Sequence, residues 1–286
     1  MQCSTPLADR GWVHGTLHAA FAPFAAQWRD HSAPQAKGFI DLSFLGQAQG
    51  HVAQEAWPDV AALARAAGFD TQLAQQSASM EWAGPPHTLE TALAELATGL
   101  RKRGHIVAWR DELQSVRDPH DAHVAALERG GFKPLGLCSQ AVHVHVETPC
   151  GLVWAGVRSA SKKENPGMLD NLAAGGVAHP EDAQKTVARE LFEEAGLRVS
   201  DLHDLRPLAW PKVTVSRPLL QGGWHHETLW LYRATTRPGV CPHNHDGEVA
   251  KFQLMTRTAC VAAINRWAFT PDAALCAALA MTEGRM

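Results

Sequence analysis

The sequence predicts an α/β fold in two parts, a smaller N-terminal α+β domain at residues 1–134 and an α/β domain at residues 135–286. Three observations predict it. Apolar residues recur at helical spacing before residue 130, valines alternate with polar residues at 141–148, and a helix follows a glycine-rich loop after residue 175. The pair Gly130–Gly131 and then Pro134 interrupt the chain, which places the boundary there.

In the first part, the spacing of apolar residues predicts helices at 60–68 and 88–103. Thr88 is suited to cap the second helix and Gly104 to end it. We expect a strand at 105–109 and a short helix at 120–129.

In the second part, strands are expected at 141–148, 151–158, 227–234 and 248–255, and helices at 258–267 and 272–281. His143 and His145 fall on one face of the first strand. A half-exposed strand face explains them better than a ligand site does.

Composition restricts the class of protein. The formal net charge of −3 argues against broad nucleic-acid or membrane binding, and no long apolar run indicates a membrane-spanning helix. The first residues lack the pattern of a secretory signal, and the six cysteines contain no CxxC pair, so we expect reduced thiols in the cytoplasm. A zinc site at Cys241, His243 and His245 is a minor alternative because a fourth ligand is not evident.

The most informative segment is GGVAHPEDAQKTVARELFEEAGL at 175–197. Glu190, Glu193 and Glu194 are spaced i, i+3 and i+4, so they share one helix face. Two like charges about 4 Å apart repel by roughly 4 kcal/mol at an effective dielectric near 20. A hard divalent cation would convert this repulsion into binding, because Mg²⁺ takes carboxylate oxygens and is often shared with substrate phosphates.

The ends and the opposite face of this helix are also marked. Pro180 suits the first helical position, and Gly196 suits the position after the helix, with Leu197 placed to contact Phe192. We expect an apolar face opposite the glutamates, formed by Val187, Ala188, Leu191, Phe192 and Ala195.

The segment resembles the Nudix box of the Nudix (MutT-like) hydrolases. All fixed positions of that motif are present: Gly175, Glu181, Arg189, Glu190, Leu191, Glu193, Glu194, Gly196 and Leu197. Pro180 stands where the usual pattern has glycine. A salt-bridged surface helix is the rival interpretation, but it explains neither the glycines nor the clustered acids.

The resemblance extends to GHIVAWRDELQSV (104–116), LERGGFKPLGLCSQAVHVHVET (127–148), SKKENPGMLDNLAAGG (161–176) and PHNHDGEVAKFQLM (242–255). Together these segments resemble a Nudix subfamily that has its own N-terminal domain and includes the Nudix half fused to thiamine pyrophosphokinase. The resemblance implies a Nudix α/β/α sandwich preceded by a smaller α+β domain, and an enzyme that hydrolyses a diphosphate linkage.

The resemblance also implies site residues. Glu193 and Glu194 are the expected main ligands of Mg²⁺, for which Mn²⁺ can substitute, and Glu190 is a ligand or a base. Arg189 orients the glutamates, Glu181 supports them, and a backbone carbonyl at Ala174 or Gly175 completes the metal shell. Glu248 is a base or extra ligand from outside the box, or equally a surface acid at a strand end.

The subfamily resemblance implies that the substrate is thiamine diphosphate, and preferentially its oxidised analogues, cut to the monophosphate. Lys162 and Lys163 are candidates to bind the diphosphate, and Trp210 or Trp224 to stack on a ring. A general nucleoside-diphosphate hydrolase is the alternative, followed by a non-catalytic ligand sensor. An isomerase of isopentenyl diphosphate is disfavoured because neither Cys138 nor Cys150 lies in the matching motif. The expected partner is a small-molecule diphosphate, with no nucleic acid and no membrane.

Overall fold

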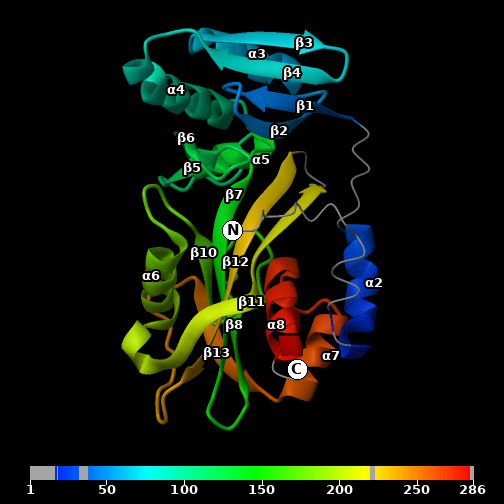
Figure 1. Cartoon of the computed structure of the whole chain (residues 1–286), viewed down its shortest axis with the longest axis vertical. Coiled ribbons are helices and arrows are strands. Elements are labelled where there is room, and N and C mark those ends of the chain that lie inside the picture. The colour runs from blue at the N-terminus through cyan, green and yellow to red at the C-terminus, as the bar shows by residue number, and fades with distance from the viewer. Residues whose placement is uncertain (1–16, 18, 32–37, 220–222, 284–286) are drawn as a thin grey trace.

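The computed structural model describes residues 17, 19–31, 38–219 and 223–283. It has two parts that are stacked along the longest axis of the molecule (Figure 1). We call residues 38–137 the N-terminal part and the remaining described residues the sandwich. No described helix combines the length and apolar character needed to cross a membrane.

The N-terminal part is built on a four-stranded sheet in the order β2-β1-β4-β3. Its strands are β1 (Phe39–Phe44), β2 (Ala48–Ala53), β3 (Phe69–Ala74) and β4 (Ser77–Trp82). The hairpin between β1 and β2 turns at Leu45 and Gly46, which both have positive φ as a tight hairpin turn requires. The sequence analysis missed this sheet entirely.

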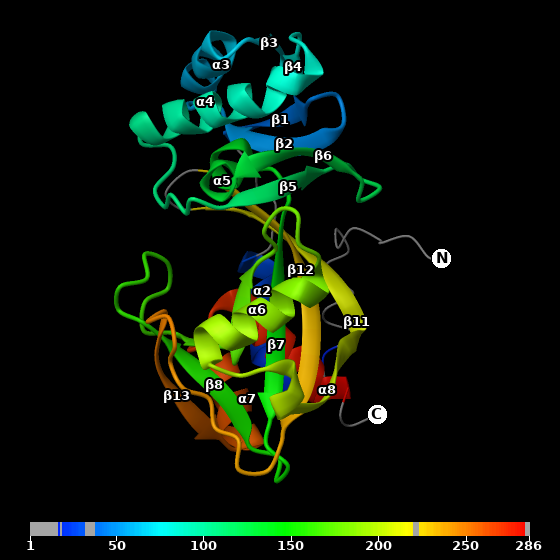
Figure 2. The ribbon, with the colours of Figure 1, turned by 90° about the vertical axis from the view of Figure 1, so that its left-hand side faces the viewer.

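Helices and a separate hairpin complete the N-terminal part (Figure 2). These elements are α3 (Trp57–Ala66), η2 (Pro86–Thr88), α4 (Leu89–Lys102), β5 (Leu113–Arg117), β6 (His123–Glu128), η3 (Arg129–Gly131) and α5 (Phe132–Leu135). They share one apolar core with the four-stranded sheet.

The two helices predicted in the N-terminal part are confirmed as α3 and α4, with Thr88 at the cap position of α4. The Thr88 hydroxyl donates to the Pro85 carbonyl instead of bonding to the helix. Two predictions are wrong. Residues 105–109 are irregular, and the expected helix at 120–129 contains the strand β6, which pairs antiparallel with β5.

The sandwich contains a seven-stranded sheet with the path β11-β12-β7-β8-β13, to which β10 adds on β7 and β9 on β8. The strands are β7 (Ser139–Glu147), β8 (Val153–Arg158), β9 (Leu169–Asp170), β10 (Ala173–Gly176), β11 (Leu202–Pro218), β12 (Trp224–Thr236) and β13 (Val249–Met255). The four strands predicted here correspond to β7, β8, β12 and β13, while β11, β9 and β10 were not predicted.

Helices cover both faces of this sheet (Figure 1). Helix α6 (Ala183–Ala195) and the short η4 (Val199–Asp201) lie on one side, and one apolar core fills the space between α6 and the sheet. A second core joins the other face to α7 (Arg257–Asn265), α8 (Pro271–Glu283), η1 (Ala19–Phe21) and α2 (Ala22–His31). The predicted fold class, an α/β/α sandwich with an α+β part before it, is confirmed.

Helix α2 bears on where the N-terminal domain begins. Phe24 and Trp28 on α2 belong to the core that contains α7 and α8, and the Asn265 side chain of α7 bonds the backbone of Ala20 and Phe24. The range 1–134 for an N-terminal domain stays a prediction. Helix α2 lies within this range but packs on the sandwich.

Strand β7 is buried on both faces. His143 and His145 are 7% and 2% exposed, so the expected half-exposed face is wrong. His143 Nδ1 is 2.9 Å from Asn171 Oδ1, and His145 Nε2 is 3.1 Å from Glu147 Oε1. The second layer of helices covers this face, which the alternation of valine and histidine cannot reveal.

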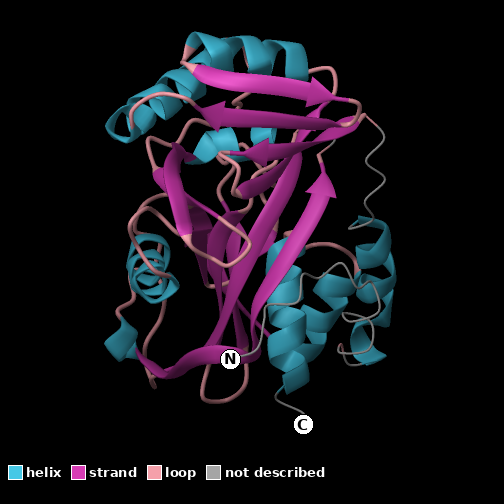
Figure 3. Cartoon of the chain, turned by 45° about the horizontal axis from the view of Figure 1, so that its top comes forward, coloured by secondary structure: helices cyan, strands magenta, loops and turns pink. Residues whose placement is uncertain are grey.

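The two parts meet where β12 begins (Figure 3). Trp224 packs edge-on against Phe39 and tilted against His51, with ring centroids 5.0 Å and 4.5 Å apart. The ring of His226 is 6.4 Å from that of His51. Burial, and then the nearby His51, lower the pKa of His226 from 6.5 to about 4.

This contact should make stability depend on pH. An unfolded imidazole takes up its proton near 6.5, whereas folded His226 resists protonation down to about 4. His226 therefore contributes stability that is present above pH 6.5 and is lost as the pH falls toward 4. We expect the melting temperature of His226→Gln to fall less steeply than wild type across this window. His87→Gln, at an exposed histidine, should retain the wild-type slope. Parallel slopes for all three proteins would contradict the prediction.

Candidate active site

Helix α6 carries the box residues and has well-defined ends. It begins at Ala183 after Asp182, whose carboxylate accepts a hydrogen bond of 2.8 Å from the Lys185 N–H. Pro180 therefore precedes the helix, and its prediction as the first helical residue is wrong. At the other end, Gly196 adopts φ 62°, and the N–H groups of Gly196 and Leu197 bond the carbonyls of Phe192 and Leu191. This is the predicted Schellman closure.

The buried face of α6 includes two of the acids. Val187, Leu191 and Ala195 are buried as expected, but Ala188 and Phe192 are exposed. Phe192 contacts the ring of His245 at 4.6 Å. Glu190 and Glu194 are only 7% and 6% exposed because the helix turns them toward strand β10. The predicted division into an acid face and an opposite apolar face is thus wrong for Ala188 and Phe192.

Arg189 holds the acids in place. Its Nε lies 3.1 Å from both carboxylate oxygens of Glu181, and one terminal nitrogen donates to Glu190 at 2.8 Å and to Glu193 at 2.9 Å. The other terminal nitrogen donates to the Gly176 carbonyl at 3.0 Å. Burial opposes the charge of Arg189, but the three carboxylates outweigh it and raise the pKa of Arg189. The geometry suits the orienting role that the resemblance implies.

Gly175 is needed because of Glu190. Its backbone is not in the left-handed region, so its requirement is not conformational. A Cβ atom at residue 175 would overlap the carboxylate of Glu190. Because Gly175 has no side chain, the buried carboxylate of Glu190 can lie against β10.

The acids fit a hard divalent cation. Burial, and then the charges of Glu190 and Asp170, raise the pKa of Glu194 well above its usual range, although the Ala174 N–H donates to Glu194 at 2.9 Å. Burial likewise raises the pKa of Glu190 despite the nearby Arg189. Buried carboxylates of like charge form a donor set whose repulsion Mg²⁺ compensates.

A cavity of about 460 Å³ lies where the two parts meet, and the box glycine forms part of its wall. The sandwich contributes residues of β7, β10 and β12, including His143, Ala174 and Gly175. The N-terminal part contributes the loop after β2, the irregular segment after α4, and residues of η3 and α5. Both parts of the chain are therefore needed to enclose the site.

Cationic side chains from both parts line this cavity: Arg110, Arg129, Lys133, Arg158 and Lys163. Three of them pair with acids, Arg129 with Glu112, Lys133 with Glu164, and Arg158 with Asp170. Burial, and then the charge of Arg129, lower the pKa of Arg110. An anionic group in the cavity would relieve this repulsion.

A smaller hollow of about 330 Å³ adjoins the first and contains several predicted residues. Lys162 and Glu248 form an ion pair there, and Lys163, which lines both hollows, donates to the Val107 carbonyl at 3.0 Å. Burial lowers the pKa of Lys162, and the charge of Glu194 raises it, so Lys162 lies within electrostatic range of the box.

The two predicted tryptophans do not line either hollow. Trp224 is 2% exposed, and its indole N–H donates to the Ser216 hydroxyl at 2.8 Å, so it has no free face for a substrate ring. Trp210 packs against the core that contains α7 and α8. The structure therefore gives no support to a stacking role for either ring.

The sequence analysis overlooked the basic residues of the N-terminal part, although Arg110 stands in the conspicuous segment GHIVAWRDELQSV. It also overlooked His225, Glu227 and Asp272, which line the cavity. The alternative zinc site gains no support. Among the described residues, Cys241, His243 and His245 do not form a metal-ligand cluster, and the described cysteines carry no disulfide.

Comparisons with known proteins agree with this site. Residues 141–274 match the NUDIX domain model. Two proteins of Arabidopsis thaliana, Nudix hydrolase 20, chloroplastic, and Nudix hydrolase 24, chloroplastic, are 31% and 29% identical over 64% and 65% of this chain, and the chain spans about half their length, 50% and 52%. The crystal structure of DR0079 from Deinococcus radiodurans aligns at 22% identity with a TM-score of 0.44, over 54% of this chain and 90% of that one. The match of residues 141–274 and the two plant relatives agree with the predicted resemblance to the Nudix superfamily.

Proposed function

We propose that this protein is a metal-dependent hydrolase of diphosphate linkages. One observation carries the proposal: Gly175, which leaves room for the carboxylate of Glu190, also lines a cavity that contains cations from both parts of the chain. Such a site offers positive charge to a diphosphate and carboxylates to a divalent cation.

Each group has a distinct task in this reaction. Glu190, Glu193 and Glu194 would hold Mg²⁺ or Mn²⁺, with the carbonyl of Ala174 or Gly175. The ion would neutralise phosphate charge and lower the pKa of a bound water. Arg189 fixes the orientation of Glu190 and Glu193, and Glu181 fixes Arg189. Lys163 and Arg110 stand where they can bind the phosphates.

Glu248 is the candidate base or extra ligand from outside the box. Its ion pair with Lys162 keeps it beside the smaller hollow. We propose that Lys162 keeps this ion pair when substrate binds and uses another of its N–H groups to donate to a phosphate.

Arg110 provides a direct test of the role of the N-terminal part. Arg110→Ala should raise KM roughly tenfold or more, the range for losing a hydrogen bond to a charged group, and should change kcat less. Arg65→Ala is a matched control, because Arg65 on α3 bonds Thr71 and does not line the cavity. An unchanged KM for Arg110→Ala would remove this residue from the phosphate site.

We further propose that the substrate is thiamine diphosphate or one of its oxidised analogues, which is cut to the monophosphate in the cytoplasm. The resemblance of residues 104–116, 161–176 and 242–255 to the thiamine-linked subfamily supports this proposal, and all three segments border the cavities. The alternative is a nucleoside-diphosphate hydrolase, which the same phosphate-binding cations would serve.

The deciding experiment compares substrates under one condition. We expect a higher kcat/KM for oxidised thiamine diphosphates than for ADP-ribose, NADH or 8-oxo-dGTP at a single Mg²⁺ concentration, with products identified by mass. A tenfold or greater preference for a nucleotide would reject the thiamine substrate and leave the diphosphatase proposal intact. No turnover of any diphosphate with Mg²⁺ or Mn²⁺ would reject both.

A further inference from the structure

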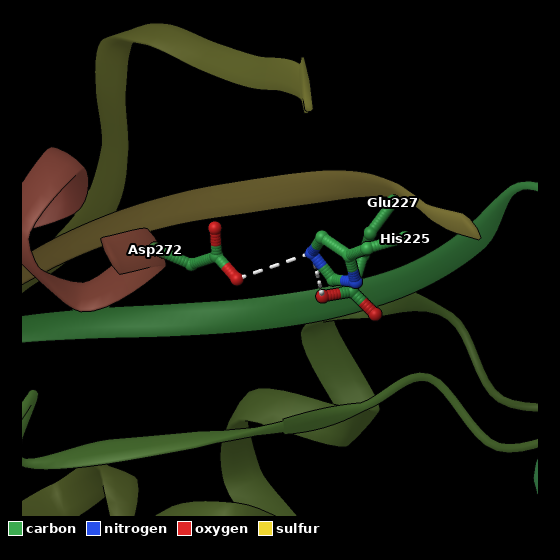
Figure 4. Close-up of side chains that lie close together, drawn as sticks. All are labelled: His225, Glu227 and Asp272. Carbon is green, nitrogen blue, oxygen red and sulfur yellow. Dashed lines mark ion pairs between the residues drawn. The ribbon is translucent and has the colours of Figure 1, made fainter. Parts of the chain in front are cut away.

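A second group of potential metal ligands lies in the wall of the large cavity (Figure 4). His225 and Glu227 stand two residues apart on β12, so they project from the same face of the strand. Asp272 comes from the first turn of α8. None of the three belongs to the Nudix box, and the proposed hydrolysis assigns them no task.

The ligand atoms of these residues converge. His225 Nε2 is 3.3 Å from Asp272 Oδ2 and 3.9 Å from Glu227 Oε2, and the three ligand atoms all lie within 4.8 Å of one another. Two ligand atoms bound about 2.1 Å from one zinc ion at a tetrahedral angle are roughly 3.4 Å apart. The spacing is therefore close to that of a coordination sphere.

Each carboxylate has one oxygen held by another residue. The Ser139 hydroxyl donates to Glu227 Oε1 at 2.7 Å, and an Arg217 nitrogen lies 3.4 Å from Asp272 Oδ1. The other oxygen of each carboxylate is the one that faces His225 (Figure 4). Supporting donors that bind one oxygen and leave the second for the ion are the usual arrangement around metal-ligating carboxylates.

The imidazole supplies an independent observation. The His225 side chain is 10% exposed, and its Nε2 is within ion-pair distance of Asp272 and Glu227 but makes no hydrogen bond of acceptable geometry among the described residues. A buried ring nitrogen that points between two carboxylate oxygens is costly unless it gains a ligand or a proton.

We propose that His225, Glu227 and Asp272 bind a second divalent cation of the zinc class. One imidazole nitrogen with two carboxylate oxygens favours Zn²⁺ over Mg²⁺, which prefers oxygen ligands alone. Beside a neutral imidazole, the two carboxylates exceed the charge of Arg217 by one unit, so the cluster favours a cation. Since all three residues line the cavity, an ion held by them would keep an open coordination position for a further ligand.

The test measures metal binding without substrate, so it does not depend on the proposed function. The Glu193→Gln/Glu194→Gln variant of the 286-residue chain, which lacks two of the box acids, is dialysed against Zn²⁺ in excess Mg²⁺. We expect one equivalent of bound Zn²⁺. Adding Glu227→Gln, which keeps the shape of the side chain and an oxygen for Ser139, should weaken this binding at least tenfold, as loss of a ligand or its support does. Asp272→Asn is the second variant, and should weaken it similarly.

Glu55→Gln in the same background is the matched control, because it removes a cavity carboxylate outside the cluster and should leave Zn²⁺ binding unchanged. Co²⁺ should also give a visible absorption band that Glu227→Gln abolishes and Glu55→Gln retains. The proposal is overturned if the box-deficient protein binds no Zn²⁺, or if the folded Glu227→Gln and Glu55→Gln variants bind it equally. A change in kcat/KM for Glu227→Gln with unaltered Zn²⁺ binding would also overturn it, and would assign the cluster to substrate contact.

Discussion

Glu194→Gln should lower kcat by roughly 10²–10⁴-fold, the scale of losing one electrostatic or acid–base element. Glu194 is 6% exposed, and burial with like charges nearby raises its pKa, so the folded protein holds this acid against its electrostatic preference. A buried acid beside like charges is expected when the acid is a ligand of a cation. Glutamine keeps the volume and an oxygen that can accept the Ala174 N–H bond of 2.9 Å.

The same variant separates catalysis from folding. Without metal, its melting temperature should equal or exceed that of the wild type, because a buried repulsion is removed. Mg²⁺ should stabilise the wild type by RT ln(1 + [Mg²⁺]/Kd), and the shift should shrink in Glu194→Gln. Glu95→Gln, at an exposed glutamate of α4, is the control for both measurements. Full activity of Glu194→Gln at saturating Mg²⁺ would show that this residue is not a metal ligand.

The sequence predicted the box helix well because its signals are local. Helical spacing, the glycine after the helix and the acid spacing are all contained within 175–197, and each depends on contacts only a few residues apart. The end of the helix is right for this reason. The helix begins at Ala183 and not at the predicted Pro180, because the side chain of Asp182 caps the helix.

The N-terminal sheet could not be read in the same way. Strand β6 has the sequence HVAALE, which favours a helix locally, yet it pairs with β5 over residues 113–117. Strand β2 reads AQGHVA, with a glycine whose position is explained only by the close approach of the Leu135 carbonyl. Pairing and packing at long range override local propensity here.

In the candidate site too, the contacts set by local sequence were predictable and those set by long-range packing were not. The acids and Arg189 lie on one helix, so their association was predictable from spacing. Arg110 is distant in sequence from Gly175, and the two residues share a cavity only because the N-terminal part packs across the end of the sandwich. His225 and Asp272 are brought together by β12 and α8. No local pattern contains such information.

Gly175→Ala should lower kcat about 10²-fold or more, with little effect on global folding. The added Cβ would occupy the place of the Glu190 carboxylate, so this side chain must move. A misplacement of about 1 Å can cost on the order of 10²-fold in rate. Because Arg189 bonds both Glu190 and Glu193, the shift would also disturb the second acid.

A double-mutant cycle tests whether the effect passes through Glu190. In a Glu190→Ala background the obstructing carboxylate is absent, so adding Gly175→Ala should change kcat by less than about twofold. The coupling between the two substitutions would then be about as large as the effect of Gly175→Ala in the wild-type protein. Additive losses would instead mean that the alanine acts on the backbone of β10 or on substrate. Circular dichroism and melting curves of all four proteins provide the control, because a cycle among unfolded variants has no meaning. If the predicted coupling is found, residue 175 must be glycine because the buried carboxylate of Glu190 occupies the space that a larger side chain would need.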